Sequence, residues 1–134
     1  MSHFTLQPDV AETLEHKGLE FLARFLGAAL EGQPRNLVVL GELANVLTQL
    51  GRYEEGLAMD RRLVTEAPRD PLARYNLACS LALLARPEEA LAELEEAVRL
   101  GYDDADFLQG DDDLVSLRDD PRFLEIVRRL EAGA

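Results

Sequence analysis

The chain matches itself when it is shifted by 34 residues. The matching pairs carry leucine or a small residue: Leu43–Leu77, Ala44–Ala78, Leu47–Leu81, Leu50–Leu84, Gly56–Ala90, Leu57–Leu91 and Leu63–Ala97. Such positions are typical of helix faces that pack on one another, with small residues where helix axes approach closely. A period of this length predicts stacked helix pairs rather than one closed globule. Each pair then needs a neighbour to cover its apolar face.

Helix-forming residues dominate the whole chain, and this predicts an all-α fold. Leu, Ala, Glu and Arg are the commonest types, and all four favour helices. No stretch alternates polar and apolar residues for long enough to indicate a strand.

Proline, glycine and aspartate mark the ends of the predicted helices. The predicted helices cover residues 8–31, 37–50, 53–66, 71–85, 87–100 and 121–131. Gly18 leaves open whether residues 8–31 form one helix or two, and Gly51 is expected to adopt a left-handed conformation. Between Gly101 and Pro121, aspartates surround short apolar islands, which predicts one or two short helical turns.

Two 34-residue units resemble the tetratricopeptide repeat, a helix–turn–helix unit with the pattern W-x2-L-G-x2-Y, then A-x3-F, then P. In the first unit the pattern positions are Leu43, Ala44, Leu47, Gly56 and Pro68, counted from Leu37. In the second unit they are Leu77, Ala78, Leu81, Ala90 and Ala97, whereas Pro87 and Tyr102 depart from the pattern. Another helical bundle is the alternative.

The resemblance implies a right-handed α–α superhelix of antiparallel helix hairpins within a single domain, residues 1–134. Residues 37–70 and 71–104 are the two clear units. Residues 8–36 are expected to be a degenerate N-terminal unit, and residues 105–134 an acidic turn followed by a C-terminal capping helix.

Two residues depart from the family pattern in a way that suggests a specific contact. Asp60 and Arg74 occupy slots where this family usually has large aromatic residues that face each other across adjacent units. We expect either an Asp60–Arg74 ion pair in place of the aromatic contact, or two side chains that point to solvent.

The resemblance also implies a function, namely non-catalytic protein–protein interaction through a concave groove that holds a peptide. The candidate partner-binding residues are Glu42, Asn45, Gln49, Tyr75, Asn76 and Cys79. An amide offers donors and an acceptor together, so Asn45 and Asn76 suit a peptide backbone; alternatively, they bond neighbouring helices. Gly41, Asp106 and Gly110 stand where a carboxylate clamp needs basic residues, so this binding mode is not expected.

The charge of the chain narrows the class of partner. The sequence has 26 acidic and 14 basic residues, a net charge of −12. This argues against nucleic acid and against an anionic membrane surface, both of which require clustered Lys and Arg. Together with Glu42, it favours a neutral to basic protein partner. The alternatives are a homodimer or larger scaffold, paired through leucines in residues 37–40, and an adaptor or chaperone subunit of a larger assembly.

A small enzyme is the least favoured alternative. Nucleophilic catalysis needs a nucleophile beside a base, and the only histidines are His3, near the terminus, and His16, on a helix among glutamates. Cys79 falls within a predicted helix, as a buried or groove-facing residue. The aspartates do not fit an EF-hand loop, because Leu108 or Val115 takes a ligand position. We expect them instead to cap helices and to form a solvated acidic turn. We therefore predict no catalytic residue, no metal site and no cofactor.

Two further observations favour the cytoplasm. Cys79 is the only cysteine, so no internal disulfide can form and a reducing compartment is expected. No apolar stretch approaches the roughly 18–20 residues of a membrane-spanning helix.

Overall fold

The computed structural model describes residues 7–133, and within them it contains helices and no strand. The helices are α1 (Pro8–Gly32), α2 (Leu37–Gln49), α3 (Tyr53–Glu66), α4 (Pro71–Leu83), α5 (Pro87–Arg99), α6 (Ala105–Gly110), the 3-10 helix η1 (Asp112–Leu117) and α7 (Pro121–Ala132). The all-α prediction is confirmed, and each predicted helix ends within two residues of its expected bounds. Residues 8–32 form one helix that Gly18 does not interrupt. His3 lies outside the described residues.

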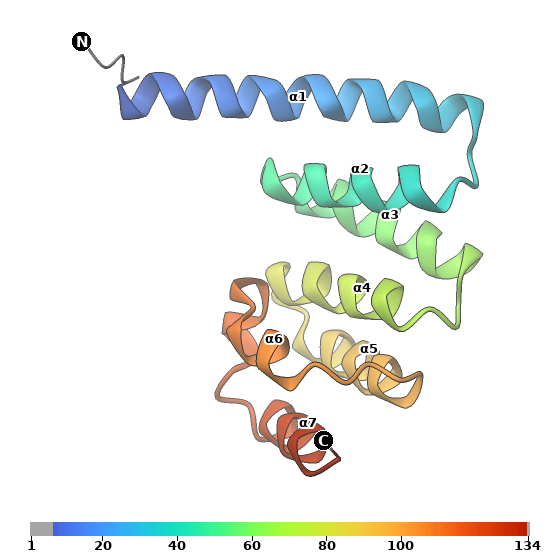
Figure 1. Ribbon diagram of the computed structural model, residues 1–134, viewed down its shortest axis with the longest axis vertical. Coiled ribbons are helices and arrows are strands. Elements are labelled where there is room, and N and C mark those ends of the chain that lie inside the picture. The colour runs from blue at the N-terminus through green and yellow to red at the C-terminus, as the bar shows by residue number, and fades with distance from the viewer. Residues whose placement is uncertain (1–6, 134) are drawn as a thin grey trace, which may run out of the picture.

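The helices stack as antiparallel hairpins along one axis, as Figure 1 shows. Helices α2, α4 and α6 begin at residues 37, 71 and 105, and α3, α5 and α7 begin at 53, 87 and 121, so each series is spaced by 34 residues. η1 packs against α4, and α7 packs against α5. The predicted superhelical array is therefore confirmed, and the segment after α5 keeps its spacing with a first helix broken into α6 and η1.

Local signals explain the helix ends. Asn36 Oδ1 accepts hydrogen bonds from the backbone N–H groups of Val38 and Val39 (3.0 and 3.1 Å), which would otherwise lack partners at the start of α2. Asp70 and Asp120 cap α4 and α7 in the same way. Gly51, after α2, has the expected positive φ of 76°. Ala85 takes the corresponding place after α4 with φ 56°, a conformation that costs an L-residue energy.

The core consists of the leucines and small residues that define the 34-residue period. Leu77 is 3% exposed, and Ala78, Ala90 and Ala97 are fully buried. At Gly56, a Cβ atom would lie 2.8 Å from Thr48 Oγ1, so a larger residue would force a shift where α3 crosses α2. The expectation that small residues allow close helix approach is confirmed.

The Asp60–Arg74 ion pair is not formed. The Ser80 hydroxyl donates to Asp60 Oδ2 at 2.5 Å, while Arg74 pairs with Glu93 at 3.1 Å. Asp60 is 3% exposed, so the solvent-facing alternative is also wrong for this residue. Both predictions failed because they considered only the slots that are aromatic in related repeats, whereas the partners lie elsewhere, on α4 for Asp60 and on α5 for Arg74.

No helix in the described part of the chain combines the length and apolarity needed to cross a bilayer.

Candidate functional site

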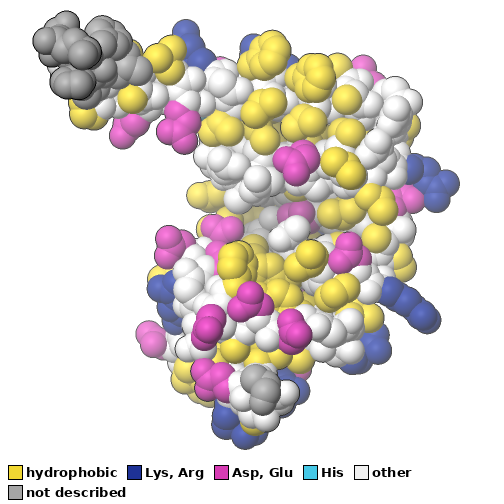
Figure 2. Space-filling model, in the orientation of Figure 1, with side chains coloured by type: hydrophobic (Ala, Val, Ile, Leu, Met, Phe, Trp, Pro, Cys, Tyr) yellow, Lys and Arg dark blue, Asp and Glu magenta, His cyan; other side chains and the backbone are white. Residues whose placement is uncertain are grey.

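The first helices of the hairpins line a groove, which is the candidate site. One cavity of about 650 Å³ lies between α2, α4 and the segment from Gly101 to Asp113. A second, of about 320 Å³, continues between α2 and α4. Because both are lined by Asn45, Asn76, Cys79 and Asp113, we treat them as one surface, the groove. Figure 2 shows acidic side chains around apolar ones over α4 and α6.

Five of the six predicted partner-binding residues line the groove: Glu42, Asn45, Tyr75, Asn76 and Cys79. Gln49, the last residue of α2, is exposed and lies outside both cavities. Asn45 and Asn76 are exposed as well. The structure thus brings five candidates together, while their role in binding stays a prediction.

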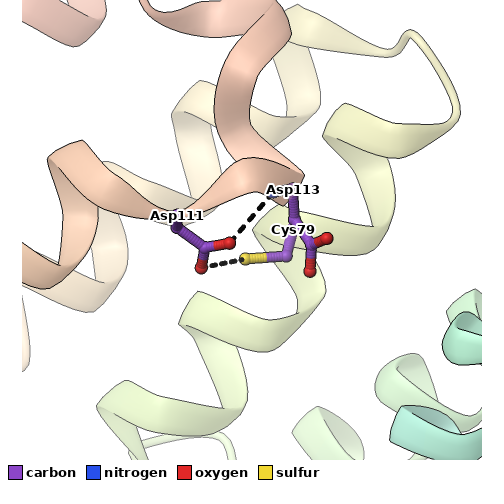
Figure 3. Close-up of side chains that lie close together, drawn as sticks. All are labelled: Cys79, Asp111 and Asp113. Atoms are coloured by element: carbon purple, nitrogen blue, oxygen red, sulfur yellow. Dashed lines mark hydrogen bonds between the residues drawn. The ribbon is translucent and has the colours of Figure 1, made fainter.

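The acidic segment after α5 packs against α4, whereas the sequence indicated a solvated turn. Tyr75 Oη donates to Asp111 Oδ2 at 2.6 Å, and the Cys79 thiol donates to the same oxygen at 3.7 Å. Asp113 backbone N–H donates to Asp111 Oδ1 at 3.0 Å, which caps η1. Figure 3 shows Asp111 beside Cys79 and Asp113, with the hydrogen bonds that join the three residues. The capping role expected for the aspartates is confirmed, but Asp111 and Asp113 are half-buried.

Aromatic residues form one wall of the larger cavity. The rings of Tyr75 and Tyr102 stack with centroids 4.7 Å apart and planes 6° apart. The Phe107 ring lies against Tyr75 with centroids 5.9 Å apart. Sequence reasoning missed Tyr102 and Phe107 as groove residues, because only the folding back of the acidic segment places them beside α4. The one available signal was Tyr102 in the slot where related repeats end with proline.

Burial and negative charge control titration in this cluster. Burial, and then the charge of Asp111, raise the pKa of the Cys79 thiol, so the thiol stays protonated at neutral pH and is a weak nucleophile. Burial also raises the pKa of Tyr102 to about 12. The pKa of Asp113 is raised by burial and by the neighbouring Asp111 and Asp112. The cluster therefore consists of hydrogen-bonded and negatively charged side chains, and it contains no activated nucleophile.

Cys79, Asp111 and Asp113 are the described residues that could share a metal ion, since their ligand atoms lie within 4.8 Å of one another. The hydrogen bonds from Tyr75, Cys79 and the Asp113 backbone already satisfy the Asp111 carboxylate. These bonds account for the close approach of the three residues without an ion.

A second surface lies on α1, which extends beyond the hairpin stack in Figure 1. Its exposed apolar residues are Val10, Leu14, Phe21, Leu22 and Phe25, and the rings of Phe21 and Phe25 stack with centroids 6.5 Å apart. In the stretch 37–40, Leu37 and Val38 are exposed, but Leu40 is fully buried. The expectation that leucines throughout this stretch are exposed is therefore wrong for Leu40.

Comparisons with known proteins agree with the repeat architecture. No family model matches the chain. The chain is 31% identical over 84 residues to a chloroplastic protein of Arabidopsis thaliana, and the match covers 60% of the chain and 25% of that protein. It is 44% identical over 55 residues to the TPR repeat-containing thioredoxin TTL4 of Arabidopsis thaliana, covering 41% of the chain and 8% of that protein. The chain thus spans a quarter or less of the length of these relatives.

A solved structure described as MamA RS-1 ArsTM double mutant matches with a TM-score of 0.70 and 19% identity, covering 87% of this chain and 68% of that one. At this identity the likeness shows the fold alone. Taken with the 34-residue spacing of the helix pairs and the match to a TPR-containing relative, it shows that the chain resembles tetratricopeptide-repeat proteins in its fold.

Proposed function

We propose that this chain is a non-catalytic interaction module that binds an extended or helical peptide segment of a neutral to basic partner in the groove. The similarity to repeat proteins supports protein binding in general, and the groove is where the residues suited to it converge. The proposal places the module in a reducing compartment such as the cytoplasm, because its only cysteine is a free thiol.

One observation carries the proposal: Asn45 and Asn76 present free amides side by side in the groove. Both side chains are exposed, both line both cavities, and neither forms a side-chain hydrogen bond within the described residues. The alternative in which they bond neighbouring helices is therefore not favoured. An amide that is free in the unbound protein can donate to and accept from a peptide backbone.

The test compares two variants that lack side-chain amides. Wild type, the double variant Asn45→Ala/Asn76→Ala, and Gln49→Ala are used to capture partners from the native cell, and the captured protein is then purified for affinity measurement. We expect the double variant to bind about tenfold or more weakly, from the loss of two hydrogen-bonding groups. Gln49→Ala removes the same chemistry outside the groove and should bind like wild type. Equal affinity for wild type and the double variant would exclude the groove as the binding surface.

Self-association is a second candidate function, favoured by the exposed apolar residues of α1. Surface apolar patches of this kind often mark protein contacts. Light scattering on the full chain measures its mass, and a dimer that Phe21→Ser/Phe25→Ser converts to a monomer would support this candidate. A monomer at all concentrations contradicts it.

A further inference from the structure

The larger cavity combines aromatic rings with carboxylates at one end of the groove. Tyr102 and Phe107 lie beside Tyr75, and the same cavity is lined by Asp103, Asp104, Asp111 and Asp113. Its volume of about 650 Å³ falls in the range of roughly 300–1,000 Å³ that is usual for ligand sites. This end of the groove can therefore enclose a side chain together with part of the backbone that carries it.

The groove carboxylates have no cationic partner within the described residues. Neither Lys nor Arg lines the groove, and Glu42, Asp103, Asp104, Asp111 and Asp113 form no salt bridge. Arg118 donates to the backbone carbonyl of Asp111 at 3.2 Å and pairs with Asp112 at 3.6 Å, but it does not line the groove.

Most of the described arginines instead pair with acidic residues on other surfaces. Four interhelical pairs join α5 to its neighbours: Arg61–Glu89, Arg74–Glu93, Arg122–Glu88 and Arg129–Glu95. Negative charge is thus compensated around α5 and left uncompensated in the groove, where low-dielectric walls focus the field on an approaching cation.

A buried hydroxyl gives an independent sign of a missing polar partner. Tyr102 lines the cavity and is only 8% exposed, yet its hydroxyl has no hydrogen-bond partner among the described residues. Buried polar groups without a partner are uncommon in native proteins, and a ligand group that reaches this wall would supply a partner for the hydroxyl.

We propose that this cavity is the anchor site for an arginine side chain of the partner. The inference rests on the proposed function, since it names what the groove recognises in its partner. A guanidinium is planar, stacks on aromatic faces, and directs several N–H donors at carboxylates in one plane. Lysine carries the same charge as a compact, strongly hydrated ammonium and lacks the planar face. The aromatic wall beside the carboxylates therefore favours arginine over lysine.

The probe is a set of peptides selected on the full chain from a phage-displayed random library. Selected peptides are synthesised with arginine, with citrulline, which keeps the shape but removes the charge, and with lysine at the enriched position. Fluorescence anisotropy then measures their affinities. We expect arginine enrichment at one position, at least about tenfold weaker binding of the citrulline peptide, and intermediate binding of the lysine peptide.

Matched variants of the protein test which of its residues bind the arginine of the peptide. Asp103→Asn/Asp104→Asn removes two charges from the cavity, and Asn at 104 retains the cap to the Phe107 N–H. We expect this variant to weaken arginine-peptide binding about threefold to tenfold. Asp106→Asn/Asp119→Asn removes two exposed charges that do not line the cavity and should have little effect. Phe107, 58% exposed, can be changed to alanine with little risk to folding, and this should also weaken binding.

The outcomes separate this inference from the proposed function. Peptides that lose affinity with Asn45→Ala/Asn76→Ala but show no preference for arginine over citrulline would overturn the arginine site and leave groove binding intact. Equal weakening by the two aspartate double variants would also overturn it, because the effect would then reflect net charge. Failure to select any peptide that depends on the groove would overturn both proposals.

Discussion

Replacing Asp60 by asparagine should make the protein progressively more stable relative to wild type as the pH rises from acidic to neutral. The Asp60 carboxyl is buried between α3 and α4, and its one hydrogen bond comes from the Ser80 hydroxyl. Burial raises its pKa from 3.8 to about 6, against the opposing effect of the Ser80 bond. The folded protein therefore holds this proton more tightly than the unfolded chain does.

The sign and size of the effect follow from that difference. Between about pH 4 and pH 6 the folded state binds more protons at Asp60 than the unfolded state, so the free energy of unfolding falls as the pH rises. A pKa difference of about 2 corresponds to about 3 kcal/mol over the full titration, at ~1.4 kcal/mol for each whole step in pKa. About 2 kcal/mol of this stabilisation is lost between roughly pH 4 and pH 7. The rest is lost below about pH 4, because Asp60 in the unfolded chain is already about half deprotonated at about pH 4.

Asparagine has nearly the same shape, can still accept from Ser80, and does not titrate. We therefore expect the stability difference between Asp60→Asn and wild type to grow by about 2 kcal/mol, in favour of the variant, from about pH 4 to about pH 7. Urea denaturation followed by circular dichroism measures both proteins at each pH. Surface glutamates whose pKa is lowered by arginine, such as Glu88 and Glu89, make the free energy of unfolding rise with pH instead. Because both proteins contain these glutamates, their effect cancels in the difference between the two proteins.

Asp119→Asn serves as the control, because Asp119 is exposed and its loss should change stability little at either pH. If the free energies of unfolding of wild type and Asp60→Asn change in parallel over this pH range, Asp60 is not a buried carboxyl that loses its proton at a cost to stability. The reasoning then fails.

Four further predictions concern packing and backbone strain. Leu77→Ala should lower the free energy of unfolding by about 2–5 kcal/mol, and a loss below about 1 kcal/mol would show that the helix register is wrong. Gly56→Ala should cost about 1–3 kcal/mol, because the new Cβ would lie 2.8 Å from a threonine hydroxyl. Its matched control in the same denaturation assay is Gly41→Ala. The new Cβ atom there makes only an ordinary contact at 3.8 Å, so this change should stabilise the protein by about 0.5–1 kcal/mol. Ala85→Gly should raise the melting temperature, since φ is 56° there, and an unchanged or lower value would contradict this strain. Cys79 should react with a disulfide reagent at least about tenfold more slowly in the folded than in the urea-unfolded protein, and equal rates would place the thiol at the surface.

The helix boundaries could be predicted because their causes are local. Each of these causes acts within a few residues: proline in a first turn, an Asx cap such as Asn36, and glycine after a helix. The amino-acid sequence alone therefore indicates where helices begin and end. The 34-residue spacing then places α2 and α4 side by side, and five predicted groove residues follow from their shared helix face.

The contacts that give the groove its chemistry were decided by the tertiary structure. Ser80 lies 20 residues from Asp60, and Asp111 lies 36 residues from Tyr75. Such pairs form only after helices from successive hairpins are stacked at definite angles, and no pattern along the chain encodes those angles at single-residue precision. For the same reason the sequence indicated a solvated turn for the acidic segment, whereas burial of its apolar residues against α4 brings two aspartates in with them. The linear order thus determined which helices form and how they repeat, and the stacking decided which carboxylates became buried, paired or left facing the groove.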